Sequence, residues 1–192
     1  MSIESESYVA GKSVIEEIIL YSNSGTPTYL KSFMVEFNLY EDIFSPCLTG
    51  NIVINDNVDL INKVPISGNE QLYVKFRTLT FDDNPNNIIE KTFQIYSIED
   101  RLLNNDRGSM YSLGLISVEG HSDQYATISK YFEGNTDDVV TDIFNDYIFR
   151  GTPLAIKDTP HISHISYISN YWSPFKNLSF ISKKTQGATL KG

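Results

Sequence analysis

The sequence Phe33-Met34-Val35-Glu36-Phe37-Asn38-Leu39-Tyr40 contains the clearest regular pattern of the chain. Phe33, Val35, Phe37 and Leu39 alternate with the other four residues, and this period of two places one apolar face of a β-strand inward. The same period recurs in five further runs, at residues 13–21, 50–55, 71–77, 89–98 and 109–118. Six strands in this length predict an antiparallel β-barrel or sandwich.

Helical patterns begin only after Glu119. Thr136, followed by Asp137 and Asp138, is typical of an N-cap with two acids in the first helical turn, and apolar residues then recur at spacings of three and four as far as residue 150. Ser173 and Pro174 predict the start of a second helix that ends near residues 183–184. We expect an extended segment at 162–171, and short helical turns at 41–44 and 57–63.

These patterns place a domain boundary near residue 119. Residues 1–118 are expected to form the β-barrel domain, and residues 119–192 a smaller α+β domain. Two helices and one extended segment are few elements for an independent core, and we therefore expect the second domain to be incomplete. The predicted fold class is α+β, dominated by β-structure.

The chain has 192 residues and a formal net charge of -9. Residues 1–118 contain 16 acids and 8 bases, whereas residues 119–192 contain 8 and 7, which places nearly all of the acidity in the first part. An acidic chain without a clustered basic face argues against a nucleic-acid-binding domain. No apolar run approaches the roughly 20 residues of a membrane-spanning helix, and the first residues lack the basic and apolar regions of a secretory signal.

The histidines and the single cysteine offer little chemistry. His161 and His164 form an HxxH pair, but Pro160 and the interleaved isoleucines favour extended structure, in which the two rings point to opposite faces. No third ligand is evident for a metal site there, and His121 has no recognisable partner. Cys47 is interpreted as a small buried apolar side chain, because no basic neighbour in the sequence would activate its thiol.

The acidic pairs have structural explanations as well. Asp137-Asp138 fits helix capping, and Asp82-Asp83 fits a solvated turn. The group Asp56, Asn57 and Asn62 lacks the spacing and central glycine of a calcium loop. No known catalytic or phosphate-binding motif is present. We therefore predict no catalytic, cofactor or metal site, and a protein that is not an enzyme.

Tyr171 and Trp172 precede the second predicted helix. A carbohydrate-stacking role is one interpretation, and a hydrophobic staple that fixes the entry into the helix is the favoured one.

Two stretches of the chain resemble the baseplate central hub protein of contractile-tailed bacteriophages. The first contains Glu41-Asp42-Ile43-Phe44, Gly50-Asn51-Ile52-Val53-Ile54-Asn55-Asp56, Leu60-Ile61, Val64-Pro65-Ile66-Ser67-Gly68-Asn69-Glu70 and Leu72-Tyr73-Val74, and the order of these elements is similar to that of the family's first barrel. The second is Tyr171-Trp172-Ser173-Pro174-Phe175-Lys176-Asn177-Leu178-Ser179-Phe180-Ile181, which looks like the helix that leads into the family's second domain. The hub part of type VI secretion spike proteins has the same layout.

The resemblance implies a tail-tube-like β-barrel and a ring of three subunits that joins the tail tube to the central spike. DNA would pass through the lumen of this ring. The expected partners are further copies of the chain, the tail tube protein and the spike protein, and the expected location is the tail baseplate of a virion assembled in the host cytoplasm. Family members carry two such barrels, whereas this sequence contains one, which again suggests an incomplete chain.

Acids along a lumen would repel passing DNA, which would explain the charge of residues 1–118; a purely solubilising role is the alternative. Two other functions remain open. The chain would be a ligand- or carbohydrate-binding β-domain of a phage tail if Trp172 binds sugars. An enzyme such as a peptidoglycan hydrolase comes last, because nothing in the sequence indicates the paired carboxylates that glycoside hydrolysis needs.

Overall fold

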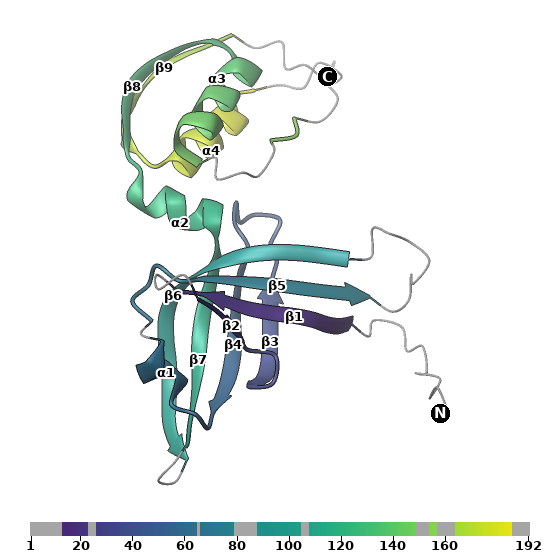
Figure 1. Cartoon of the computed structure of the whole chain (residues 1–192). Coiled ribbons are helices and arrows are strands. Elements are labelled where there is room, and N and C mark those ends of the chain that lie inside the picture. Colours follow the sequence, from purple (N-terminus) through teal and green to yellow (C-terminus); the bar gives the residue numbers. More distant parts are fainter. Residues whose placement is uncertain are drawn as a thin grey trace. The chain divides into compact units, whose positions relative to one another are not determined.

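The computed structural model describes residues 13–22, 26–64, 66–78, 88–104, 108–148, 154–156 and 164–185. The chain divides into two compact units (Figure 1). The division falls between Ser117 and Val118, and Ile43–Cys47 group with the second unit.

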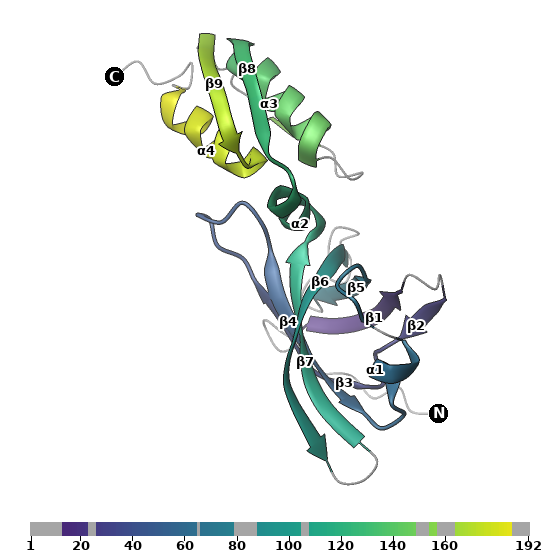
Figure 2. The same cartoon turned by 90° about the vertical axis from the view of Figure 1, so that its left-hand side faces the viewer.

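The first unit is a curled, antiparallel sheet of seven strands in the order β2-β1-β5-β6-β7-β4-β3 (Figures 1 and 2). Its elements are β1 (Ser13–Tyr21), β2 (Pro27–Tyr29), β3 (Met34–Tyr40), β4 (Thr49–Asp56), α1 (Leu60–Lys63), β5 (Gln71–Thr78), β6 (Ile88–Asn104) and β7 (Gly108–Ser117). The β-dominated fold and all six predicted strands are confirmed; β2 was not predicted. In the described part of the chain the sheet is a half-barrel with β2 and β3 at its ends.

The core lies on the concave face of this sheet. Alternating residues of five strands meet there, and the buried members are Ile18, Leu20, Leu30, Ile52, Ile54, Leu60, Leu72, Val74, Phe93, Ile95, Tyr111, Leu113 and Leu115. Phe37 of β3 and Phe76 of β5 also meet, with ring centroids 6.4 Å apart, although three strands separate β3 from β5 in the sheet. The curl therefore brings distant strands together around one apolar core.

Strand β6 bends because its pairing is irregular. It pairs with β5 through residues 88–94 and with β7 through residues 93–104, with register shifts between Ile95 and Ser97 and between Glu99 and Leu102. Such β-bulges increase the local twist of a strand. The bulges thus let β6 belong to both halves of the curled sheet.

The second unit begins with α2 (Val118–Tyr125). It continues with β8 (Ile128–Asn135), α3 (Thr136–Ile143), a π-helical turn η4 (Phe144–Ile148), β9 (His164–Trp172) and α4 (Pro174–Lys184). Strands β8 and β9 form an antiparallel pair, and α3 and α4 lie on one side of it (Figures 1 and 2). The buried core comprises Ile128, Phe132, Val139, Ile143, Ile165 and Ile181.

The helix predictions are confirmed in part. Ser173 is the N-cap of α4, its hydroxyl accepts the Lys176 N–H, and Pro174 occupies the first turn. Thr136 as the N-cap of α3 is wrong, because Asn135 has the extended cap backbone and Thr136 is already helical. The helical turn predicted at 41–44 is also wrong, since those residues form a loop between β3 and β4. Strand β8 and helix α2 were not predicted.

Candidate functional site

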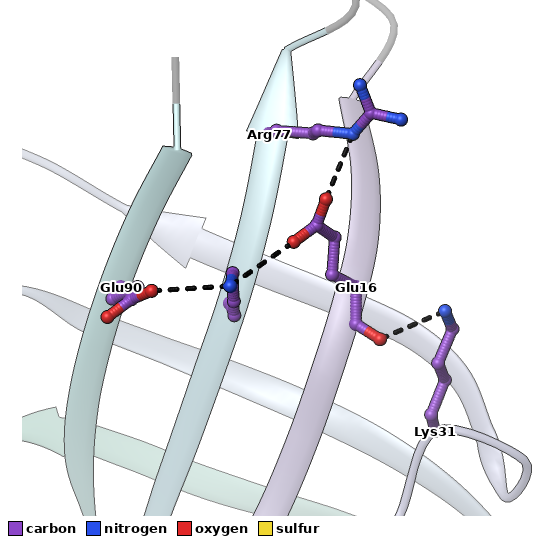
Figure 3. Close-up of polar contacts among 5 residues, drawn as sticks. Glu16, Lys31, Arg77 and Glu90 are labelled. Atoms are coloured by element: carbon purple, nitrogen blue, oxygen red, sulfur yellow. Dashed lines mark hydrogen bonds and ion pairs between the residues drawn. The ribbon is translucent and has the colours of Figure 1, made fainter. Parts of the chain in front are cut away.

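The convex face of the sheet carries a band of alternating charges across β1, β5 and β6. The register pairs Glu17 with Lys75 and Lys75 with Glu90, and directly paired residues of an antiparallel sheet lie on the same face. A bulge between Ile15 and Glu17 adds Glu16 to this band. Figure 3 shows the resulting contacts.

Glu16 connects two cations of β5. Its carboxylate lies 3.0 Å from Arg77 Nε and 3.6 Å from Lys75 Nζ, and Lys75 Nζ lies 3.5 Å from Glu90 (Figure 3). Desolvation lowers the pKa of Lys75, but the hydrogen bond and charge of Glu90 and the charge of Glu16 outweigh it and raise the pKa overall. The network therefore keeps Lys75 protonated and ties three strands together.

Carboxylates outnumber cations on the convex face. Two further acids, Glu36 and Glu99, lie in register with Val53 and Ser112 toward the other end of the same face. Asn38 donates to Glu36 at 2.9 Å, and Ser97 donates to Glu99 at 2.7 Å. The strands thus present five glutamates against Lys75 and Arg77, which concentrates part of the first unit's negative charge on one surface.

Two strand edges of the first unit have no neighbouring strand among the described residues. One is β3, at the end of the sheet, where Val35 and Tyr40 are exposed. The other is the second half of β6, which pairs with β7 alone and exposes Tyr96 and Leu102. Open edges with apolar side chains are the places where further strands or other chains add to a sheet.

Asp56 and Glu70 are buried, with 1% and 0% exposure, and both have structural roles. Asp56 accepts the N–H groups of Val58 and Ile61 at the start of α1, and Glu70 accepts those of Ser67 and Gly68 in the turn before β5. Desolvation raises the pKa of each carboxyl, but the backbone hydrogen bonds outweigh it and hold the pKa below its ordinary value. These acids shape loops, and their donors occupy both carboxylates.

The structure does not bring the predicted histidines together into a site. His121 lies 4.8 Å from the ring of Tyr125, and burial lowers its pKa. His164 Nε2 is 3.7 Å from a Glu133 oxygen at the exposed end of β9, whereas His161 lies outside the described residues. Among the residues that the structure describes, no group of three or more His, Cys, Asp and Glu side chains is arranged to hold a metal ion.

The cysteine and the acidic pairs stay apart from one another. Cys47 is half-buried rather than buried, because it lies in the exposed loop after β3, with its sulfur 3.8 Å from the Ser45 hydroxyl. Asp137 and Asp138 occupy the first turn of α3, in agreement with the capping interpretation. Asp82 and Asp83 lie outside the described residues.

Trp172 belongs to an aromatic cluster. Its ring lies 5.3 Å from Phe180 and 6.4 Å from Tyr167, and Lys176 Nζ lies 5.1 Å from its centroid. The staple position in α4 is Asn177, which is polar and donates to the carbonyls of Ser173 and Trp172. The packing interpretation of Trp172 is thus supported, but its apolar partner is Phe180 rather than the staple residue.

Tyr171, beside it, is 73% exposed and has a φ of 53°, a rare conformation for a bulky residue.

The sequence-based search missed Glu16 and its cations. The alternation of charged residues in 13–21, 71–77 and 89–98 was a usable signal, but only the strand register shows which charges meet. Asp123 was missed for the same reason, because its carboxylate accepts the Phe175 N–H at 2.6 Å from a residue 52 positions away.

Comparison with known proteins identifies no relative: no protein-family model matches the chain, and no curated protein matches it. None of the described helices combines the length and hydrophobicity needed to cross a membrane.

Proposed function

We propose that this chain is a structural component of a phage tail baseplate hub, in which copies of the chain form a ring between the tail tube and the central spike. The observation that carries this proposal is the curled sheet with open edges at β3 and β6. Edge strands of this kind are stabilised when neighbouring subunits cover them. Head-to-tail contacts between identical subunits close into a ring when the rotation permits it.

The charge of the convex face supports the passage of DNA. The five glutamates on this face exceed the two cations that pair with them, and a negative wall repels the phosphate backbone. In the proposed ring this face lines the lumen, where repulsion lets DNA move without binding. The proposed partners are the tail tube above, the spike below and DNA in transit, in a virion assembled in the host cytoplasm.

A structural rather than catalytic role agrees with how the buried acids are used. Asp56 and Glu70 are held by backbone donors of their own loops, which leaves neither placed as a general acid or base. We therefore propose that the chain is not an enzyme.

Light scattering of the purified full chain tests the ring. A trimer has three times the 21.8 kDa mass of one chain, and we expect this mass to persist on dilution into the low micromolar range. A particle that stays monomeric at high concentration, also with tail tube and spike proteins present, would contradict the proposal.

One observation favours a second function, the binding of carbohydrate. Tyr171 is exposed and holds a backbone conformation that costs energy, and such strain is found at binding sites. If this function holds, Tyr171→Ala abolishes binding in a glycan array while the unfolding transition stays in place. Retention of the same glycan profile in the variant would rule out Tyr171 as the binding platform.

A further inference from the structure

The loop between β3 and β4 presents bulky apolar side chains to solvent. Ile43 is 92% exposed and Phe44 is 93% exposed, the two highest values among the exposed large hydrophobic residues of the described chain. Two acids, Glu41 and Asp42, directly precede them and are also exposed. We name these four residues, Glu41-Asp42-Ile43-Phe44, the acidic tip. Adjacent apolar side chains with this exposure are typical of a contact site.

The second unit carries a surface with the opposite charge. Lys176 Nζ lies 5.1 Å from the ring centroid of Trp172, and Lys184 Nζ lies 5.8 Å from that of Phe180. The two half-buried rings are themselves 5.3 Å apart, so the four side chains are contiguous on β9 and α4. We name these four residues the lysine–aromatic patch.

The aromatic surface of this patch extends further. Tyr167 lies 5.0 Å from Phe180 and 5.5 Å from Phe132, and Lys130 Nζ lies 5.3 Å from the Phe132 ring. No ion pair between described residues occupies Lys130, Lys176 or Lys184. The rings therefore offer apolar contact area, and the ammonium groups around them are available to carboxylates.

The acidic tip and the lysine–aromatic patch match in both charge and polarity. The tip has two carboxylates beside an isoleucine and a phenylalanine, and the patch has two ammonium groups beside two aromatic rings. The match also follows the distribution of charge in the whole chain, with a net charge of -8 before residue 119 and -1 after it. An anionic membrane is a poorer occupant for the tip, because Glu41 and Asp42 would be repelled by its headgroups.

We propose that the acidic tip of one copy of this chain binds the lysine–aromatic patch of a second copy. Phe44 and Ile43 pack against Trp172 and Phe180, while Glu41 and Asp42 pair with Lys176 and Lys184. The contact is heterologous, since it joins different surfaces of the two copies, and repetition closes a ring or extends a chain. This inference rests on the proposed ring and names the contact that builds it.

Light scattering of the full chain, run in parallel with the fluorescence of Trp172, tests the contact. Trp172 is the only tryptophan, so its emission reports on the patch alone. We expect the emission to shift to shorter wavelength as the concentration rises and the association proceeds. Ile43→Ser with Phe44→Ser should weaken association by about tenfold or more, because two large apolar side chains no longer leave water.

Charge exchange separates the proposed contact from general stickiness. Lys176→Glu with Lys184→Glu should also weaken association, and Glu41→Lys with Asp42→Lys added to the lysine variant should restore it. Leu102→Ser is the control for the apolar change, because Leu102 is 65% exposed on β6. Lys91→Glu, at an exposed position of β6, is the control for the charge change.

The outcomes distinguish this contact from the ring itself. A ring that forms equally well in all of these variants overturns the contact and leaves the proposed function intact. Open chains that depend on the tip and the patch support the contact and overturn the ring. A monomer with constant Trp172 emission overturns the contact; if that monomer binds neutral or anionic vesicles through Phe44, the tip is a membrane contact instead.

Discussion

Glu70 and Gly68 are joined across a tight turn: the Glu70 carboxylate accepts the Gly68 N–H at 2.8 Å, and Gly68 has a φ of 98°. The same carboxylate accepts the N–H and hydroxyl of Ser67, each at 2.9 Å. Gln94 of β6 donates to the Gly68 carbonyl at 3.0 Å. A fully buried acid therefore fixes the turn that leads into β5 and connects it to the neighbouring strand.

Replacing Glu70 with alanine should lower the free energy of unfolding by about 2–4 kcal/mol, because three donors in the turn lose a charged acceptor. Urea unfolding followed by circular dichroism measures the change. Glu90→Ala is the matched control: it removes an exposed carboxylate and should cost at most about 1 kcal/mol. Equal losses in both variants would show that burial of Glu70 is not what matters.

The stability of the first unit should fall at acidic pH. The folded pKa values of Asp56 and Glu70 lie below their ordinary values of 3.8 and 4.5. A carboxyl with a depressed folded pKa contributes stability above its unfolded pKa and loses it as the pH falls toward the folded value. The contribution is therefore complete above about pH 5 and declines below it.

Urea titrations at several pH values between neutral and acidic conditions measure this decline. The double variant Asp56→Asn with Glu70→Gln should show a flatter profile over the same range, although it is less stable at neutral pH. An unchanged slope in the double variant would assign the acid sensitivity to other groups.

Two glycines of the sheet should differ in their tolerance of a side chain. A Cβ at Gly50 would lie 2.5 Å from the backbone oxygen of Asn38 in β3, whereas a Cβ at Gly114 would meet the side chains of Ser97 and Tyr96. Side chains can rotate away, but a paired backbone cannot. Gly50→Ala should thus cost about 2–3 kcal/mol and Gly114→Ala about 1 kcal/mol. Thermal unfolding of the two variants compares them, and the reverse order would contradict this account.

Asn177 should be essential for the second unit. Its side chain is fully buried, donates to the Ser173 carbonyl at 2.9 Å and accepts the Tyr167 hydroxyl at 3.1 Å. Asn177→Ala leaves these groups without their partner and should cost about 2–3 kcal/mol. The emission of Trp172 follows the unfolding of this unit, and Asn170→Ala, at an exposed position of β9, is the control.

A second variant tests the reason for that loss. Burial raises the pKa of Tyr167 to about 12, which keeps its hydroxyl protonated as a donor at neutral pH. Tyr167→Phe combined with Asn177→Ala should therefore cost less than the sum of the two single changes, because the donor and the acceptor disappear together. Strict additivity would mean that the two side chains do not interact.

The sequence predicts those elements whose pattern is local. Alternation in 33–40 marks β3, and Ser173 with Pro174 marks the start of α4, because periodicity and capping depend on neighbours along the chain. Strand β8 was missed because Ser129, Lys130 and Tyr131 interrupt its alternation, all three being exposed. Helix α2 was missed because Glu119, Gly120 and Ser122 give it a polar composition.

The candidate site could be predicted far less well. The contact between Glu16 and Arg77 depends on a bulge in β1 and on the register of β1 with β5, and neither follows from residue types alone. Asp56 and Glu70 were quoted as features of a pattern, but their roles as buried hydrogen-bond acceptors depend on the folded loops. The exposure of Ile43 and Phe44 likewise emerges only in three dimensions, because apolar residues beside β3 would ordinarily be assigned to a core.

Electron microscopy of the purified full chain in negative stain tests the central claim most directly. We predict class averages of a threefold ring with an open centre, and a particle that falls apart in the Ile43→Ser, Phe44→Ser variant. Featureless particles of monomer size at every concentration, or closed assemblies without a central opening, would contradict the account of this chain as a hub through which DNA passes.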